Sequence, residues 1–437
     1  MPEAQDRSQK HTTHLNKFDG SNTVNNSSIY RRIRALNSFQ YINFRLVWLA
    51  HSCHVAAMWS VSVILGWVTF DITGSPFFTA ISIGVGAIPP IIFGPIAGIF
   101  IDAWNRKQIL AVTCIFQCFT TLIFSYFVWV EMINIWSILT FSIINGIWDS
   151  IYFPTMNATV SNTVPRKTLV NAFSLIHLAD SFTRLFVPIV TGLLISLVGP
   201  GPSALLPASF LFISFLASSK ISLRSKKSHP INIRSAYLDM VVAIKYIGSN
   251  RAVLGFILVV FAPLFFVTPV NIGLMPVYAS EVFGGGPKTL GILVSALGTG
   301  MTIGTVILAS LRDIRRLGIS TIASMLGMAM GLLVFSRTSN LIYGIIVLIP
   351  YGVSMTAFWT LSGSALQIIV PDKLRGRVTS MSMLTHTSLP MGTVLVGILS
   401  EQTGIQTASA VSSIGMILFT LITFVSIPKM SRFTTNT

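Results

Sequence analysis

The chain has 437 residues, of which 52% are hydrophobic and only 10% charged, and its formal net charge is +16. A basic nucleic-acid-binding domain would gather its charge on a fold of low hydropathy, so this composition excludes that class and we expect no nucleic-acid partner. A chain this apolar indicates an integral membrane protein surrounded by lipid.

The first 45 residues are polar, with clusters of Asn, Ser and Thr and no apolar run of the signal-peptide type. Such a segment buries too little apolar surface to fold by itself. We therefore expect residues 1–45 to form a disordered, basic cytoplasmic tail. A second short tail is expected at residues 429–437.

Twelve apolar runs follow, each of roughly 18 to 26 residues and so long enough to cross a membrane. Backbone groups in lipid must be paired within the segment, so these runs predict helices and not a barrel. The predicted spans start near Val47, Phe77, Gln108, Trp136, Leu169, Ala204, Ala252, Leu290, Ile319, Leu341, Val378 and Thr407.

The basic residues predict the orientation of these spans. Of the 29 Lys and Arg residues, 26 fall in segments on one predicted side, Arg184 falls within a span, and only Lys288 and Arg337 fall on the other side. Cytoplasmic loops carry the excess of Lys and Arg. We therefore expect an inner (plasma) membrane protein with both termini in the cytoplasm.

The longest interior polar stretch, residues 220–251, divides six spans from six. Apolar residues recur at helical spacing over residues 234–247, which predicts an amphipathic helix at the inner membrane surface. The chain is therefore predicted to form an N-terminal bundle at residues 46–219 and a C-terminal bundle at residues 252–428, joined by a cytoplasmic linker.

The two predicted bundles share a register of 206 positions. Coincidence in an apolar chain is the alternative to a duplicated six-helix unit, which is the architecture of alternating-access transporters. The matched pairs are Gly94 and Gly300, Gly98 and Gly304, Arg106 and Arg312, Val164 and Val370, Pro165 and Pro371, Lys167 and Lys373, and Ser174 and Ser380.

A loop motif between the second and third spans carries a family resemblance. The order and spacing of Gly98, Asp102, Arg106, Lys107 and Leu110 resemble the signature loop of the major facilitator superfamily. In that superfamily the loop is a latch that favours the outward-open state, and the resemblance implies this role for Gly94, Gly98, Asp102, Arg106 and Lys107. The alternative interpretation is that the basic residues of this loop only reflect the general excess of Lys and Arg in cytoplasmic loops.

Two positions of the loop depart from the superfamily pattern. Ala103 replaces the usual Arg, which should weaken the latch. Asn105 replaces the usual Gly, a mild change because Asn tolerates a left-handed backbone.

The resemblance extends over residues 40–430 and is greatest to the branch of macrolide and enterobactin exporters. It implies an all-α integral membrane fold with twelve transmembrane helices in two pseudo-symmetric bundles, a monomer, and a proton gradient in place of a cofactor or metal. The antiporter signature of the fifth helix is kept only in part: Pro188 and Gly192 match, whereas Val187 and Thr191 stand where Gly is usual.

Ionisable residues within spans are costly and predict functional sites. His51 and His54 lie in the first span, Asp149 in the fourth, and Asp180 and Arg184 in the fifth. Helical spacing places the polar groups of each span on one face, which predicts a wetted cavity in the N-terminal half.

Each of these groups has a competing structural interpretation. Asp180 and Arg184 are spaced to form an ion pair within their helix. Asp149 has no such partner, so it must bond across helices, meet water or be protonated. We predict that it couples transport to protons, with a bond to Arg184 as the alternative. His51 and His54 either titrate or only bond a neighbour.

Further polar and aromatic residues within spans are predicted to line the substrate cavity. They are Asn145, Asn271, Tyr351, Trp359 and His386. For Trp359 the alternative is a packing role. A cavity that is acidic on one wall and aromatic on the other suits an amphipathic organic substrate.

These features predict a proton-coupled exporter of an amphipathic small molecule such as a drug, a macrolide or a siderophore. The competing interpretation is an importer or facilitator of a metabolite or siderophore on the same fold. We do not expect an enzyme, because the sequence has no HExxH motif, nucleophile elbow or phosphate-binding loop.

Overall fold

The computed structural model describes residues 34–93, 104–222, 245–311, 316–371, 374, 378 and 383–428. Every regular element in this part of the chain is a helix. The N-terminal half contains η2 (Arg34–Gln40), α3 (Ile42–Thr73), α4 (Pro76–Gly84), η3 (Val85–Ala87), α6 (Arg106–Trp129), α7 (Ile135–Thr163), η4 (Arg166–Thr168), α8 (Leu169–Val198), α9 (Pro200–Ser203) and α10 (Leu205–Ser219).

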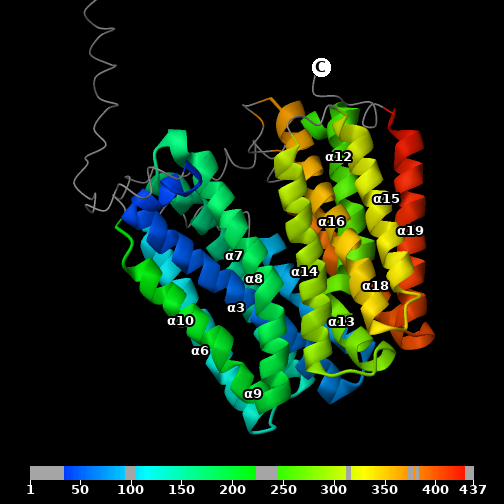
Figure 1. Cartoon of the computed structure of the whole chain (residues 1–437), viewed down its shortest axis with the longest axis horizontal. Helices are drawn as coiled ribbons and strands as arrows, with labels where there is room; N and C mark the ends of the chain where they lie inside the picture. Colours follow the sequence, from blue (N-terminus) through cyan, green and yellow to red (C-terminus); the bar gives the residue numbers. More distant parts are fainter. Residues whose placement is uncertain are drawn as a thin grey trace, which may run out of the picture.

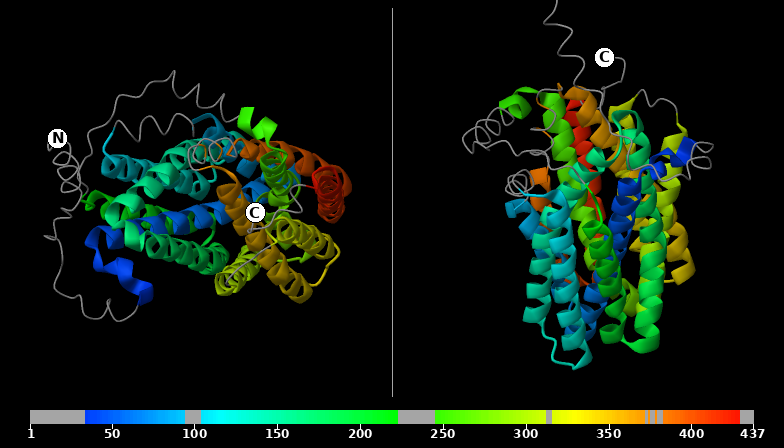
Figure 2. Two further views of the ribbon diagram at one scale, coloured as in Figure 1. Left: turned by 90° about the horizontal axis from the view of Figure 1, so that it is seen from above. Right: turned by 90° about the vertical axis from the view of Figure 1, so that its left-hand side faces the viewer.

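The C-terminal half is also built from helices, but its first helix is more irregular. It contains α12 (Arg251–Ala262), η5 (Pro263–Val267), η6 (Pro269–Gly273), α13 (Met275–Val277), η7 (Tyr278–Val282), α14 (Pro287–Ser310), α15 (Leu317–Phe335), α16 (Leu341–Ile369), η8 (Met383–Thr387), α18 (Ser388–Thr403) and α19 (Ile405–Ser426). Figures 1 and 2 show the two halves side by side.

Ten helical segments in the described residues are long and apolar enough to cross a membrane. Two of the twelve predicted spans are not among them. The fourth corresponds to α7, which has 29 residues but carries Asn145, Asp149 and Asn157. The eleventh corresponds to α18, which has only 16 residues. The all-helical membrane fold is therefore confirmed, whereas the count of twelve stays a prediction.

The 206-residue register seen in the sequence recurs in the structure. α7 and α16 have 29 residues each, and both start and end 206 positions apart. Each is capped by an Asn side chain, Asn134 and Asn340, that accepts backbone N–H groups of the first turn. α8 and α18, one position off this register at their ends, both stop at a glycine with a positive φ, 83° at Gly199 and 82° at Gly404, a conformation that costs Gly little.

The two halves meet through two related helix pairs. α8 packs along α14, and α18 packs along α4. The backbones come very close at Gly192 and Gly291, where an added Cβ would lie 2.4 Å from the Pro287 carbonyl oxygen and 2.5 Å from that of Pro188, respectively. Small residues permit such close approach of membrane helices. In Figure 1 the two halves converge at the end that holds α9, the α9 end, and diverge toward the opposite end.

Basic residues at the helix termini are divided between the two ends of the molecule. α6 begins at Arg106, η4 holds Arg166 and Lys167, and α12 begins at Arg251, all opposite the α9 end. The described basic residues at the α9 end are Lys288, in the first turn of α14, and Arg337, just after α15. The predicted topology divides them in the same way.

Helical structure begins earlier than the sequence predicted. Residues 34–45 were expected to belong to the disordered tail, but η2 and the first turn of α3 occupy them. Ser38 donates from its backbone N–H (2.9 Å) and its hydroxyl (2.7 Å) to the side-chain oxygen of Asn171. The ring of Phe39 packs edge-on against Phe44 and Trp48. These contacts tie the segment to the N-terminal half.

Several predicted features lie outside the described residues. They are the first 33 residues of the tail, most of the linker with its amphipathic helix, residues 429–437, and the loop residues Gly94, Gly98 and Asp102.

Candidate functional site

Asp149, near the middle of α7, is bonded across helices, which is one of the three alternatives that the sequence left open. Its Oδ1 atom lies 3.2 Å from Nε2 of His54 on α3 and accepts a hydrogen bond of 2.8 Å from the amide of Gln117 on α6. The side chain of His54 is 1% exposed, and that of Asp149 is 26% exposed. The imidazole also stacks on Tyr152 at a centroid distance of 3.4 Å. The carboxylate therefore joins three helices.

Asp180 on α8 forms a second pair of the same kind. Its Oδ1 atom lies 2.8 Å from Nε2 of His51, and its Oδ2 atom lies 3.5 Å from Nδ1 of His177. The His51 side chain is 6% exposed, whereas that of His177 is 70% exposed. The carboxylate of Asp180 thus lies between a buried histidine, His51, and an exposed histidine, His177.

The helical period explains why both pairs form. His51 and His54 are one turn apart on α3, so both project from one face. That face meets α7 at Asp149 and α8 at Asp180. Within the described residues, Nδ1 of each histidine is buried without a hydrogen-bond partner. In each pair one proton already lies between Nε2 and the carboxylate oxygen, and uptake of a second proton by the pair changes its net charge from −1 to zero.

Gln117 is a member of this cluster that the sequence analysis did not identify. It is 3% exposed and supplies the shorter of the two hydrogen bonds to Asp149. Its Oε1 atom has no partner among the described residues. A lone amide in the middle of the third apolar run was the signal that could have indicated it.

The predicted ion pair between Asp180 and Arg184 does not form in the described structure. His51 and His177 occupy the carboxylate of Asp180 instead. The alternative bond from Arg184 to Asp149 is also wrong, because His54 and Gln117 hold that carboxylate. Arg184 lies over the ring of Trp59, 5.1 Å from its centroid.

The C-terminal half brings two of its predicted cavity residues together. The Tyr351 hydroxyl donates to Oδ1 of Asn271 at 2.6 Å, and the Asn271 amide lies 3.9 Å from the sulfur of Met355. Asn271 is held by the π-helical turn η6, which interrupts the first helix of this half. Such turns are frequent at functional sites. Both side chains are buried, at 0% and 5% exposure for Tyr351 and Asn271.

The other three predicted cavity residues do not join this pair in the contacts of the described residues. Asn145 donates to the carbonyl oxygen of Phe141 in its own helix at 2.9 Å. Trp359 packs edge-on against Phe358, as the packing interpretation predicted. His386 is exposed on η8.

The described part of the signature loop shows how α6 begins. Nη1 of Arg106 donates to the carbonyl oxygen of Ala158 on α7 at 3.1 Å. Asn105 makes no use of the left-handed backbone that Asn tolerates. Its φ is −70°, and its side chain accepts the backbone N–H of Lys107, so it caps α6.

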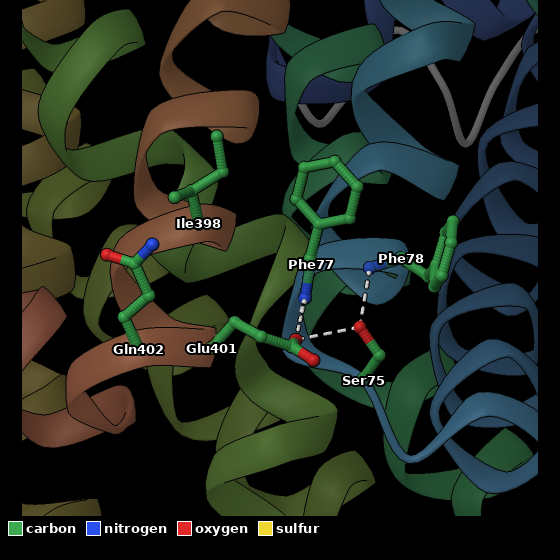
Figure 3. A pocket seen from close by; sticks show the side chains of 6 residues that line it. All are labelled: Ser75, Phe77, Phe78, Ile398, Glu401 and Gln402. Carbon is green, nitrogen blue, oxygen red and sulfur yellow. Dashed lines mark hydrogen bonds between the residues drawn. The ribbon is translucent and has the colours of Figure 1, made fainter.

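A pocket of about 220 Å³ lies between the two halves at the α9 end, and sequence reasoning missed it. Ser75, Phe77, Phe78, Ile398, Glu401 and Gln402 line it (Figure 3). Oε2 of Glu401 accepts from the hydroxyl of Ser75 at 2.8 Å and from the backbone N–H of Phe77 at 3.2 Å. An acid of α18 thus caps the N-terminus of α4, where the helix dipole favours negative charge.

A second acid lies close to this contact. Glu281 on η7 has a raised pKa because it is partly buried and because the Glu401 carboxylate repels its charge. The α9 end therefore carries two neighbouring carboxylates, of which Glu401 binds the opposite half.

We expect Glu401→Ala to shift the protein toward a state in which the α9 end is open. The substitution removes both hydrogen bonds between α18 and the start of α4, and Glu401→Gln should have a smaller effect because it keeps an acceptor. Distances between spin labels at the exposed residues Asp71 and Thr403 measure this opening. Gln402→Ala, next to Glu401 in the same pocket, is the control. Equal distance distributions in Glu401→Ala and in the unsubstituted protein would contradict the prediction.

Comparisons with known proteins agree with this architecture. A family model described as transmembrane secretion effector matches residues 33–436. Macrolide efflux protein A of Streptococcus pyogenes is 19% identical over 373 residues, which cover 83% of this chain and 91% of that protein. A staphyloferrin A transporter of Staphylococcus aureus is 22% identical over 370 residues, with the same coverage of 83% and 91%.

The fold is also that of solved transporters. The structure of a D-xylose–proton symporter superposes with a TM-score of 0.69 at 14% identity, covering 91% of this chain and 99% of the other. The family and its structural neighbours are membrane transporters and not enzymes. The chain therefore belongs to the transmembrane secretion effector family of major facilitator transporters, as the loop motif and the two-half register suggested.

Proposed function

We propose that the protein is a proton-coupled exporter of an amphipathic organic small molecule and works by alternating access. The observation that carries this proposal is the pair of contacts between buried histidines and partly exposed aspartates, His54 with Asp149 and His51 with Asp180. Both contacts lie in the N-terminal half of the molecule. α8, which carries Asp180, packs against α14 of the other half, and α3, which carries both histidines, packs against α8. No cofactor enters the proposal, because a proton gradient supplies the driving force.

The coupling step follows from the charge of each pair. A neutral histidine beside an ionised aspartate carries one negative charge, which is costly to keep away from water. Uptake of a proton makes the pair neutral overall. We propose that the pairs load protons while they face the outside and lose them to the cytoplasm, where substrate binds in exchange.

The rest of the proposal concerns the placement of the chain in the membrane. Twelve spans, with α7 and α18 as the fourth and eleventh, place both termini on one side. The concentration of basic residues opposite the α9 end supports a cytoplasmic location for that side. We propose a monomer in the inner (plasma) membrane, with the α9 end facing outward.

Import or facilitated transport on the same fold is the competing function. The match to a staphyloferrin A transporter supports a siderophore as substrate. The match to a macrolide efflux protein supports a drug to the same degree. The direction of flux separates export from import.

The test uses everted membrane vesicles from cells that express the full chain. Three fluorescent probes share a pyrene body and differ only in the head group: pyrenebutyrate, pyrenebutanol and pyrenebutyl-trimethylammonium. We expect at least one of them to accumulate in the vesicles, and a protonophore to abolish that accumulation. Vesicles without the protein are the control. Accumulation that persists in the presence of the protonophore would contradict proton coupling. If none of the probes accumulates, that result would contradict export of this class of compound.

A further inference from the structure

Arg184 is a cation at the centre of the molecule without an acidic partner among the described residues. It lies near the middle of α8, a helix of 30 residues. Its Nη1 atom lies 3.1 Å from the sulfur of Met301, and the guanidinium covers the ring of Trp59 at 5.1 Å. Neither contact neutralises the charge.

Two donors at this place are unused in the described part of the chain. They are Nε of Arg184 and Nε1 of Trp59, and both atoms are buried. Leaving a buried donor unpaired is costly, and more so when the group is charged. A bound group with acceptor oxygens would remove this cost.

The acids nearest in the fold are already engaged. Asp180, one turn before Arg184, is held by His51 and His177. Asp149 is held by His54 and Gln117. Asp180 acts on the charge of Arg184 only at longer range, and the sulfur of Met301 is the one described acceptor within hydrogen-bond distance of its guanidinium.

The position of Arg184 is that of a substrate site in this architecture. Trp59 belongs to α3 and Arg184 to α8, both in the N-terminal half, whereas Met301 belongs to α14 in the other half. An added Cβ at Gly298 of α14 would lie 2.7 Å from the carbonyl oxygen of Arg184, so the two halves touch here. Transporters built from two such halves bind substrate between them near the middle of the membrane.

We propose that Arg184 and Trp59 bind the carboxylate of an amphipathic organic substrate, an inference that rests on the proposed transport function. The planar guanidinium offers paired donors that match the two oxygens of a carboxylate. The indole N–H of Trp59 adds a third donor, and its ring offers apolar surface to the substrate body. Carboxylate binding takes the guanidinium away from Met301 and so alters a contact between the halves.

Binding to the purified full-length protein tests this proposal independently of transport. Energy transfer from tryptophan to pyrene reports binding of pyrenebutyrate, pyrenebutanol and pyrenebutyl-trimethylammonium. We expect the carboxylate to bind at least about tenfold more tightly than the alcohol, as charge-assisted hydrogen bonds do. Arg184→Gln should remove this preference, Arg184→Lys should keep part of it, and Trp59→Phe should weaken it less than Arg184→Gln.

A matched control separates the site from the overall charge of the protein. Arg337→Gln removes one exposed positive charge at the α9 end and should leave the preference unchanged. The proposal is overturned if the unsubstituted protein does not prefer the carboxylate, or if Arg184→Gln prefers it equally. If Arg184→Gln does not fold, the same comparison is made with Arg184→Lys and Trp59→Phe.

The two proposals fail in different ways. Gradient-driven accumulation of the alcohol or the ammonium probe, without an Arg184-dependent carboxylate preference, overturns the carboxylate site and leaves export intact. An Arg184-dependent carboxylate preference without accumulation of any probe supports the site and contradicts export.

Discussion

Replacing Asp149 with Asn is expected to reduce gradient-driven export to the level of vesicles without the protein. Asn has nearly the same shape and still accepts the hydrogen bond from Gln117, but it takes up no proton. The charge-assisted contact with His54 is lost, which should cost about 1–3 kcal/mol of stability and leave the protein folded. The protonophore-sensitive accumulation of the pyrene probes in everted vesicles measures the effect.

Exchange of substrate without a gradient distinguishes lost coupling from a lost binding site. We expect Asp149→Asn to exchange labelled for unlabelled probe across the membrane at a rate near that of the unsubstituted protein. Asp71→Asn, at an exposed aspartate near the end of α3, is the matched control and should not change export. Unchanged gradient-driven export in Asp149→Asn would show that this carboxylate does not couple transport to protons.

The sequence predicted which polar residues share a helix face, but not which faces meet. Helical period alone places His51 with His54. The absence of a partner within α7 left Asp149 three alternatives: a bond across helices, contact with water or protonation. The identity of those partners depends on how α3, α6 and α7 pack, and no periodicity records that. Gln117 was missed for this reason.

The error at Arg184 has a different cause. Spacing of four residues permits an ion pair with Asp180, but an exposed pair within one helix is worth only about 0.2–0.5 kcal/mol. A buried histidine on α3 offers Asp180 a contact of 2.8 Å. The contact between His51 and Asp180 forms instead of the ion pair, and Arg184 stays available to bind another group.

Glu401 shows the limit of local reasoning most clearly. An acid near the end of an apolar helix is usually exposed to solvent and gives no sign of a partner, and the partner of Glu401, Ser75, is 326 positions away in the chain. The contact exists because α4 packs on α18 as α14 packs on α8, so that the two helix pairs are counterparts in the duplicated architecture. Only the three-dimensional arrangement of the two halves places the acid at the start of α4.

A valine at Gly291 is expected to abolish transport, because this glycine lets α14 touch α8. Its Cβ would lie 2.5 Å from the carbonyl oxygen of Pro188 and 3.0 Å from Cα of Ile189. These are backbone atoms, so the clash is relieved only if the two halves separate, at about 1–3 kcal/mol for overpacking. The closed α9 end should then become rare, which spin labels at Asp71 and Thr403 would report as a longer distance.

Gly363→Val on α16 is the control for this substitution, because nothing lies within 4 Å of an added Cβ at Gly363. It makes the same chemical change in a helix of the same half and should leave export and the label distance unchanged. A Gly291→Val protein that exports normally would show that the close approach of α8 and α14 is not needed in any state of the cycle. Loss of export with an unchanged distance would place the defect in substrate binding and not in closure, because Arg184 lies about one turn of α8 away from Pro188.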